Sequence, residues 1–340
     1  MITRLLRKFT SLNRNRMRLF WSFWIFSCLH FPAADAKSLS YSDNDTMMLF
    51  RGYEDTLKTL QYDKISEHST DKEKLDANRH FLHVLRSALE LPGSIHYPFD
   101  SLTTIGRITS PDNQFRIITW DIAKNDGTFL YYGFIQSYNH AAHRYILYEL
   151  NDKSAEITDP HDAVYTPDKW FGMLYYKVVP ERYAGKTIYM MLAWQGYSSI
   201  ITRKIIDVLS FNDKGEPSFG MAVFKKPPPG SRGNFRRIIF QYSANAFMSL
   251  TYNSKKNIIV FDHLAPMEAQ LVGQYQYYAP SFIVDCLAYK GSGWQYMADI
   301  DARNPSNSED KDYIDPSKHA PDMNKKEHDF DAHSLYNPDK

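Results

Sequence analysis

From about Leu102 to Asp299, apolar and polar residues alternate along short runs that are separated by turn residues. A period of two gives each run one apolar face, which is typical of β-strands with one buried side. About a dozen such runs follow one another without intervening helical patterns, which indicates an antiparallel sandwich or barrel. The runs also fall into loose groups of three or four, so the alternative is a propeller-like arrangement, although no fixed repeat supports it.

Each apolar run is expected to form one strand, and two glycine turns join neighbouring runs into hairpins. These turns are Lys124–Gly127 and Asn212–Gly215, where glycine supplies the positive φ of a tight turn. Lys225–Asn234 contains three consecutive prolines and is expected to form an exposed loop, because proline cannot sit in a central strand. The expected strands are 115–122, 129–135, 144–149, 171–179, 187–194, 204–211, 218–224, 235–242, 247–252, 257–262, 274–278, 282–289 and 294–299.

Two helices are expected ahead of the strands, at residues 43–62 and 70–90. In the second helix, Thr70 precedes Glu73 by three residues, the spacing of a capping box, and Pro92 and Gly93 end the helix. Each helix has one apolar side, so both are expected to pack on the β domain. The apolar side of the first helix comprises Met47, Tyr53, Leu57 and Leu60, and that of the second Leu75, Phe81, Leu82, Leu85, Ala88 and Leu89.

Both ends of the chain differ from its middle. Residues 1–36 combine a basic start, an apolar run at 19–31 and Ala34-Asp35-Ala36, which together predict a cleavable signal peptide and a mature chain from Lys37. The apolar run is shorter than the ~20 residues of a membrane-spanning helix; an uncleaved anchor, or lipid attachment at Cys28, are the alternatives. Residues 301–340 are polar and predict a disordered tail. The expected division is therefore 1–36, a helical segment 37–95, a β domain 96–300 and the tail 301–340.

Loss of the leader changes the charge and cysteine content. The whole chain has 40 basic and 39 acidic residues; residues 1–36 hold six of the basic residues and one acid, which leaves 34 and 38 and a net charge of −4. A mildly acidic protein is a poor partner for nucleic acid or an anionic membrane surface. Cys286 is the only cysteine after residue 36, so no intramolecular disulfide can form, and a buried structural thiol is expected.

Several stretches resemble an uncharacterised family of exported bacterial proteins, periplasmic or secreted. They are Leu91–Leu102, Thr104–Asp112, Phe115–Asp121 and Val260–Pro266, and the resemblance extends over most of residues 80–295. It implies export from a bacterium. Separately, no segment after residue 36 is apolar over a length that could cross a membrane, so no transmembrane anchor is expected after cleavage. The resemblance implies neither an activity nor functional residues.

Three groups of polar residues are candidates for catalysis or metal binding. Asp262 and His263 have the residue types of a general-base pair, but neighbours in a strand point to opposite faces and no Gly-x-Ser-x-Gly motif supplies a nucleophile. The second group matches no strong metal motif, so no metal site is predicted. Its members are His140, His143, Asp159, His161 and Asp162. The third group, acids in or beside strands, includes Asp100, Asp121, Asp207 and Asp285, with Asp121 and Asp207 as the preferred pair for a hydrolase.

Aromatic residues are the outstanding compositional feature: they make up 15% of the chain, which has 24 tyrosines. Tyrosine and tryptophan are favoured at interfaces, although they also pair across strands. The candidate binding residues are Tyr275, Tyr277, Tyr278, Trp194 and Tyr197. Strand alternation would place Tyr275 and Tyr277 on one face, with Tyr278 on the other.

These features favour an exported, non-catalytic binding protein with a protein or glycan partner in the cell envelope. No phosphate-loop or dinucleotide-binding motif is present, so no cofactor is predicted. The alternatives are a secreted hydrolase that acts on envelope or dietary polymers through carboxylates, and a structural subunit of an envelope complex.

Overall fold

The computed structural model describes residues 43–65, 69–228 and 235–300. The expected signal peptide, Cys28 and the expected tail lie outside these residues, as does most of the proline-containing loop. The described chain is mainly β, with two helices and antiparallel sheets, and none of its sheets closes into a barrel. The predicted fold class, helices packed on a large antiparallel sandwich, is confirmed.

The strands form three sheets, which are largely made of strands consecutive in the chain. Sheet 1 has the order β1 (Gly106–Thr109), β2 (Phe115–Ala123), β3 (Phe129–Asn139), β4 (Arg144–Asn151). Sheet 2 has the order β10 (Ile238–Ser243), β7 (Ile201–Phe211), β6 (Lys186–Gly196), β5 (Leu174–Tyr183), with β8 (Pro217–Phe219) paired to β7. Sheet 3 has the order β11 (Leu250–Asn253), β12 (Ile258–Pro266), β13 (Tyr278–Tyr289), β14 (Trp294–Met297), β9 (Phe224–Lys226). Among the strand pairs of the described residues, β14 and β9 alone run parallel.

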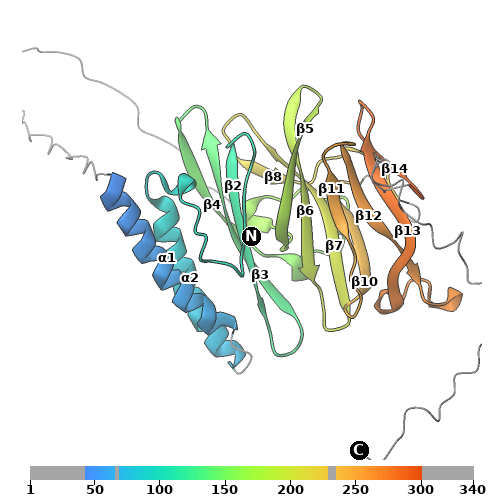
Figure 1. Cartoon of the computed structure of the whole chain (residues 1–340), viewed down its shortest axis with the longest axis horizontal. Helices are drawn as coiled ribbons and strands as arrows, with labels where there is room; N and C mark the ends of the chain where they lie inside the picture. Colours follow the sequence, from blue (N-terminus) through green and yellow to red (C-terminus); the bar gives the residue numbers. More distant parts are fainter. Residues whose placement is uncertain (1–42, 66–68, 229–234, 301–340) are drawn as a thin grey trace, which may run out of the picture.

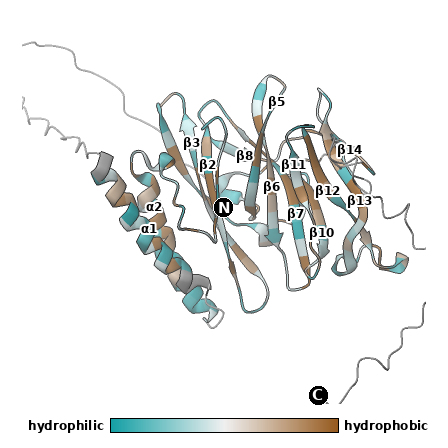
Figure 2. Cartoon of the chain, viewed as in Figure 1, coloured by the Kyte–Doolittle hydropathy of each residue, from teal (hydrophilic) through white to brown (hydrophobic). Residues whose placement is uncertain are grey.

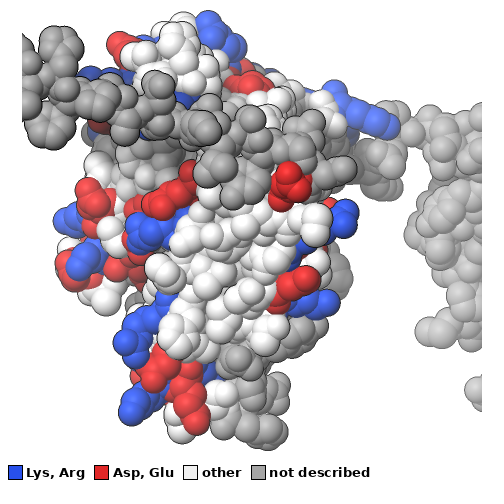
Figure 3. Space-filling view, turned by 90° about the vertical axis from the view of Figure 1, so that its left-hand side faces the viewer, with Lys and Arg blue, Asp and Glu red and all other residues white. Residues whose placement is uncertain are grey.

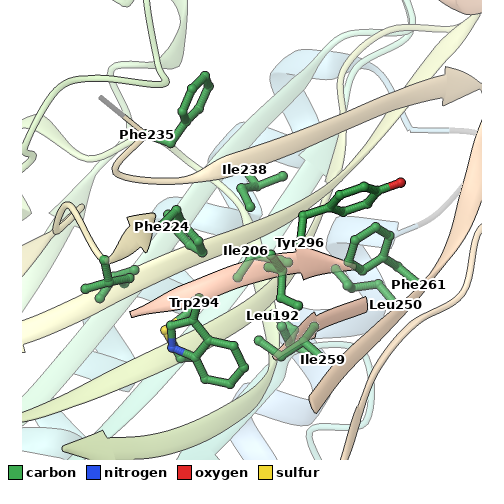
Figure 4. Packing of buried hydrophobic residues seen from close by; sticks show 14 of the residues in the cluster. Leu192, Ile206, Phe224, Phe235, Ile238, Leu250, Ile259, Phe261, Trp294 and Tyr296 are labelled. Atoms are coloured by element: carbon green, nitrogen blue, oxygen red, sulfur yellow. The ribbon is translucent and has the colours of Figure 1, made fainter. Parts of the chain in front are cut away.

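The elements stack as four layers: the helix pair, sheet 1, sheet 2 and sheet 3 (Figure 1). A separate hydrophobic core fills each of the three spaces between layers. In β2, Ile117 faces sheet 2 whereas Ile118 faces the helices, as alternation along a strand requires. Figure 4 shows the core between sheets 2 and 3, where Leu192 and Ile206 meet Phe261. The groups of strands seen in the sequence are these successive sheets.

Helix α2 (Asp71–Glu90) begins at the predicted capping box. The Thr70 backbone N donates to Glu73 Oε2 at 2.7 Å, and the Glu73 backbone N donates to Thr70 Oγ1 at 3.3 Å. Phe81 and Leu85 are fully buried against sheet 1, whereas Leu82 is only half-buried. The predicted apolar side is therefore correct but centred on Phe81 and Leu85.

Helix α1 (Asp43–Ile65) packs with most of its expected apolar side: Leu57 is buried, and Tyr53 and Leu60 are half-buried against the same core. Phe50 is also buried and lies on the same helix face as Leu57, seven residues later, whereas Met47 is 44% exposed. Between them Glu54 also faces inward, where it accepts hydrogen bonds from the Tyr97 hydroxyl and from the Ser101 backbone N. A buried acid with two donors takes a position that the apolar pattern alone would give to a hydrophobic residue. Seen from the helix side, groups of both charges surround an uncharged area (Figure 3).

Most expected strands are present, and hydropathy follows the layers, with hydrophobic segments in the strands and hydrophilic turns (Figure 2). Both predicted glycine turns exist, with φ of 80° at Gly127 and 75° at Gly215. The expected strand 218–224 is instead two strands, β8 in sheet 2 and β9 in sheet 3, and β9 takes in the first residues of the expected exposed loop. The expected strand 274–278 is wrong, because Tyr275–Tyr277 forms a short 3₁₀ helix, η5.

Candidate functional site

The connection between β12 and β13 forms a small lobe, at the lower right in Figure 1. It contains the short helices η4 (Ala269–Leu271) and η5. Its two ends are joined because Pro266 pairs with Tyr278 and the Met267 backbone N donates to Tyr277 O at 3.0 Å. Gly273 has φ of 86°, and its backbone N donates to the Tyr278 hydroxyl at 2.9 Å. These bonds fix the lobe against the end of sheet 3.

The candidate tyrosines lie in this lobe with an arrangement set by the 3₁₀ helix. In a 3₁₀ helix, residues three apart eclipse each other, and the rings of Tyr275 and Tyr278 indeed lie 5.1 Å apart. The predicted opposition of Tyr275 and Tyr278 across a strand is therefore wrong. Tyr275 and Tyr277 are 38% and 41% exposed, so both rings reach solvent. Tyr278 is half-buried and packs on the core between sheets 2 and 3.

A bulge beside the lobe exposes two further apolar residues. The β12–β13 register jumps from Asp262–Val284 to Leu264–Pro280, so three residues of β13 lie opposite His263. Extra residues in one strand bend it and re-aim its side chains. The outcome is that Phe282 is fully exposed and Ile283 is 41% exposed.

Two neighbouring turns extend the apolar surface. The Ala244 backbone N donates to Ile200 O at 3.0 Å, which joins the turn after β10 to the turn after β6. The turn after β10 is also joined to β12, because the Ser249 backbone N donates to Asp262 Oδ2 at 2.7 Å. The exposed large apolar side chains at this end of the sheets, which we call the apolar rim, are Tyr197, Ile200, Phe247, Met267, Val272, Tyr275, Tyr277, Phe282 and Ile283.

The two candidates from β6 and its following turn have different surroundings. Tyr197 belongs to the rim, and the Arg203 guanidinium lies over its ring at 3.4 Å. Gln241 Oε1 accepts from Arg203 Nε at 3.0 Å, which holds the guanidinium in that position. Trp194 is half-buried and packs edge-on against Phe129 at 5.8 Å. Trp194 thus supports the neighbouring strands and lies outside the rim.

An aspartate–histidine pair lies at the bulge, with a partner that the sequence did not reveal. His263 Nδ1 is 2.7 Å from Asp285 Oδ2, whereas Asp262 binds the Ser249 backbone instead. Asp285 is buried and also accepts from the Tyr296 hydroxyl at 2.8 Å, and burial together with this bond raises the pKa of Tyr296. The His263 side chain is 40% exposed. Within the described residues no hydroxyl or thiol is hydrogen-bonded to its imidazole.

The acids considered for hydrolysis lie in separate environments. Asp207 is fully buried and forms an ion pair with Arg237 at 3.1 Å, and burial raises the pKa of this carboxyl. Asp100 is exposed and pairs with Arg107 at 3.3 Å. Asp121 lies opposite Tyr131 in sheet 1. Asp207 is therefore closed off from any substrate.

The histidines considered for metal binding are also dispersed. His140 is exposed and its Nε2 is 3.1 Å from Gln114 Oε1, whereas His161 packs edge-on against Phe235 at 5.8 Å. Among the described residues, no three histidine, cysteine, aspartate or glutamate side chains gather as a metal site. Cys286 is buried, as expected. Neither described helix is long and apolar enough to cross a membrane.

No protein-family model, curated protein or solved structure matches this chain.

Proposed function

We propose that this chain is an exported, non-catalytic binding protein whose apolar rim docks a protein of the cell envelope. The observation that carries the proposal is the concentration of large exposed apolar side chains at one end of the strands of sheets 2 and 3, where Phe282 is fully exposed. Soluble monomers rarely leave contiguous apolar surface exposed unless a partner covers it.

The composition of the rim favours a protein partner. Tyrosine, phenylalanine and methionine are enriched at protein interfaces, and charged residues are depleted at the centre of such interfaces. From Leu264 to Ile283 the only charged residue is Glu268, and the turns 197–200 and 244–249 have none. These segments contribute no lysine or arginine, and Arg203 beside Tyr197 is hydrogen-bonded to Gln241, so the rim lacks the basic cluster that attracts nucleic acid or anionic lipid.

Binding is favoured over hydrolysis by the state of the candidate catalytic groups. Asp207 is held in a buried ion pair, and among the described residues the His263 imidazole is hydrogen-bonded to Asp285 and to no hydroxyl or thiol. A hydrolase that uses two carboxylates needs both of them beside its substrate.

Export is the part of the proposal that rests on residues 1–36. The basic start, short apolar run and small residues at positions 34 and 36 support removal of the leader. Intact-mass measurement on protein recovered from the producing cell should give an N-terminus at Lys37 or within about two residues of it. Recovery of the mature species with Met1 in place would contradict export by cleavage.

Site-specific photo-crosslinking tests the docking surface. A photoreactive phenylalanine analogue at Phe282 should yield one dominant protein adduct in the producing cell. The same analogue at Met48, which is 70% exposed on α1, serves as the matched control and should not give that adduct. In the Phe282-labelled protein, Tyr275→Ala with Tyr277→Ala should reduce the adduct at least about tenfold, the effect of losing about 1.4 kcal/mol of binding free energy.

Two controls make the result decisive. Tyr278 is left unchanged because its hydroxyl accepts the Gly273 backbone N–H and its ring supports Tyr275. Thermal unfolding of the double variant should match the parent, because both removed rings are exposed. An undiminished adduct in the double variant, or the same adduct from Met48, would show that the rim is not the docking surface.

A further inference from the structure

A cleft lies away from the rim, where sheets 1 and 2 meet. It has a volume of about 900 Å³, and its walls are β4, the short helix η3 (Pro167–Lys169), the start of β6 and the β7–β8 turn. Lys186 begins β6 whereas Tyr197 follows its last residue, so about 30 Å of extended strand separates the cleft from the rim. The volume is within the range of small-molecule sites, roughly 300–1,000 Å³.

Two aromatic rings line the cleft. Phe211 is half-buried, and its ring is held by Phe115 at 5.3 Å and by Tyr189 at 5.9 Å. Tyr148 is also half-buried and packs on the core between sheets 1 and 2. Both rings are fixed by the core beneath them, so they offer apolar surface at little cost in side-chain entropy.

Beside the rings, the β7–β8 turn presents a fixed amide and carboxylate. Asn212 Oδ1 accepts from the Lys214 and Glu216 backbone N atoms, each at 3.0 Å. Asn212 Nδ2 donates to Glu216 Oε2 at 2.6 Å, which sets the direction of an otherwise exposed carboxylate. Burial and, after it, the negative charge of Glu216 raise the pKa of Tyr148, and the neutral phenol can donate a hydrogen bond.

The remaining walls of the cleft add negatively charged hydrogen-bond acceptors. Glu149 lies in the cleft and pairs with Arg86, Asp168 lies on η3, and Lys186 contributes one positive charge. Three carboxylates against Lys186 and the Arg86 partner leave the cleft mildly acidic. Such a lining repels phosphorylated or acidic ligands, whereas carboxylate and amide groups suit ligands rich in hydroxyl groups.

From this geometry we infer that the cleft is a binding site for a short oligosaccharide without acidic groups. The sugar faces lie on Phe211 and Tyr148, and ring hydroxyls donate to Glu216 and Glu149. The site is independent of the rim, so loss of one binding activity leaves the other intact.

Isothermal titration with defined hexasaccharides tests the inference. The probes are hexamers of β1,4-linked glucose, α1,4-linked glucose and N-acetylglucosamine, with hexagalacturonate as the acidic comparison. At least one neutral hexamer should bind, whereas hexagalacturonate should not. Glu216→Gln should weaken that binding at least about tenfold. Asp213→Asn removes the same charge from a neighbouring exposed residue that does not line the cleft, so this control should bind like the parent.

Three outcomes would overturn the inference. They are the absence of binding by every neutral hexamer at millimolar concentration, equal binding of hexagalacturonate, and equal weakening by Glu216→Gln and Asp213→Asn. Tyr275→Ala with Tyr277→Ala provides a further check, because a cleft that is independent of the rim should bind sugar equally well in that variant. Thermal unfolding of Glu216→Gln should match the parent, since Glu216 is exposed.

Discussion

His161 connects the stability of the fold to pH. Its ring packs edge-on against Phe235, and its Nδ1 is buried without a hydrogen-bond partner. Burial lowers the pKa of His161, although the neighbouring charge of Asp159 opposes the shift. The folded protein therefore keeps a neutral imidazole at a pH where the unfolded chain, with a usual pKa of about 6.5, takes up a proton.

The sign follows from this difference. Stability attributable to neutral His161 is complete above about pH 6.5 and declines as the pH falls below it, until the folded imidazole also protonates. His161→Phe keeps a ring against Phe235 and removes the titration. Urea unfolding at about pH 7.5 and about pH 5.5 should show a smaller decline for the variant than for the parent. Equal declines would mean that the pKa of His161 is the same in the folded and the unfolded state.

At the scale of elements, α2 offers a comparison between two leucines that the sequence pattern treats alike. Leu85 is fully buried against sheet 1, whereas Leu82 is half-buried at the edge of the same face. Leu85→Ala should reduce the free energy of unfolding by ~2–5 kcal/mol, because a cavity remains in a close-packed core. Leu82→Ala should cost less than half as much, because less apolar area leaves contact with the protein. Chemical denaturation of both variants measures the difference, and equal costs would contradict the described docking of α2.

The elements also show what local sequence could and could not predict. The hairpin turns and the capping box were predicted correctly, since glycine at positive φ and the Thr70–Glu73 spacing act within a few residues. The segment Gln274–Tyr278 alternates like a strand, yet Tyr275–Tyr277 is helical: the Gln274 backbone N donates to Leu271 O and the Tyr277 backbone N donates to Gln274 O, and strand pairing starts only at Tyr278. The pairing of His263 with Asp285 spans 22 residues and depends on strand register, which one sequence does not reveal.

For the whole molecule, the predicted sandwich or barrel did not include the order of the layers, although the sequence indicates which strands are covered on both faces. Phe115–Trp120 of β2 and Ile188–Ala193 of β6 are buried at every position, as strands covered on both faces should be. By contrast, Ile258–Phe261 of β12 alternates between buried and half-buried residues, as expected for an end layer. Ile188–Ala193 is apolar throughout, and Phe115–Trp120 is apolar except for Arg116 and Thr119, so largely apolar runs mark the inner sheets. Which faces meet depends on long-range packing.

The path of the chain predicts how the stack unfolds. The chain passes from β8 in sheet 2 to β9 in sheet 3, back to β10 and again to β11, so sheets 2 and 3 are joined three times. By contrast, α1 leads into α2 alone. Among its described residues, Phe50 and Leu57 are the only apolar side chains buried in the core between the helices and sheet 1. Segments that are linked repeatedly and share a core should open together, whereas a helix with few buried contacts should open at a lower free energy.

Native-state hydrogen exchange at increasing denaturant concentration measures these openings. Amides in the middle of β7 and β12 should share one opening free energy, equal to that of global unfolding, because neither sheet can separate without exposing the core that contains Ile206 and Phe261. Amides of α1 should exchange through a smaller opening that leaves the sheets intact. The comparison is internal to one protein, so solution conditions affect all three elements alike. If β12 opened at a lower free energy than β7, sheet 3 would be a separate unit, and the repeated crossings would not couple it to sheet 2.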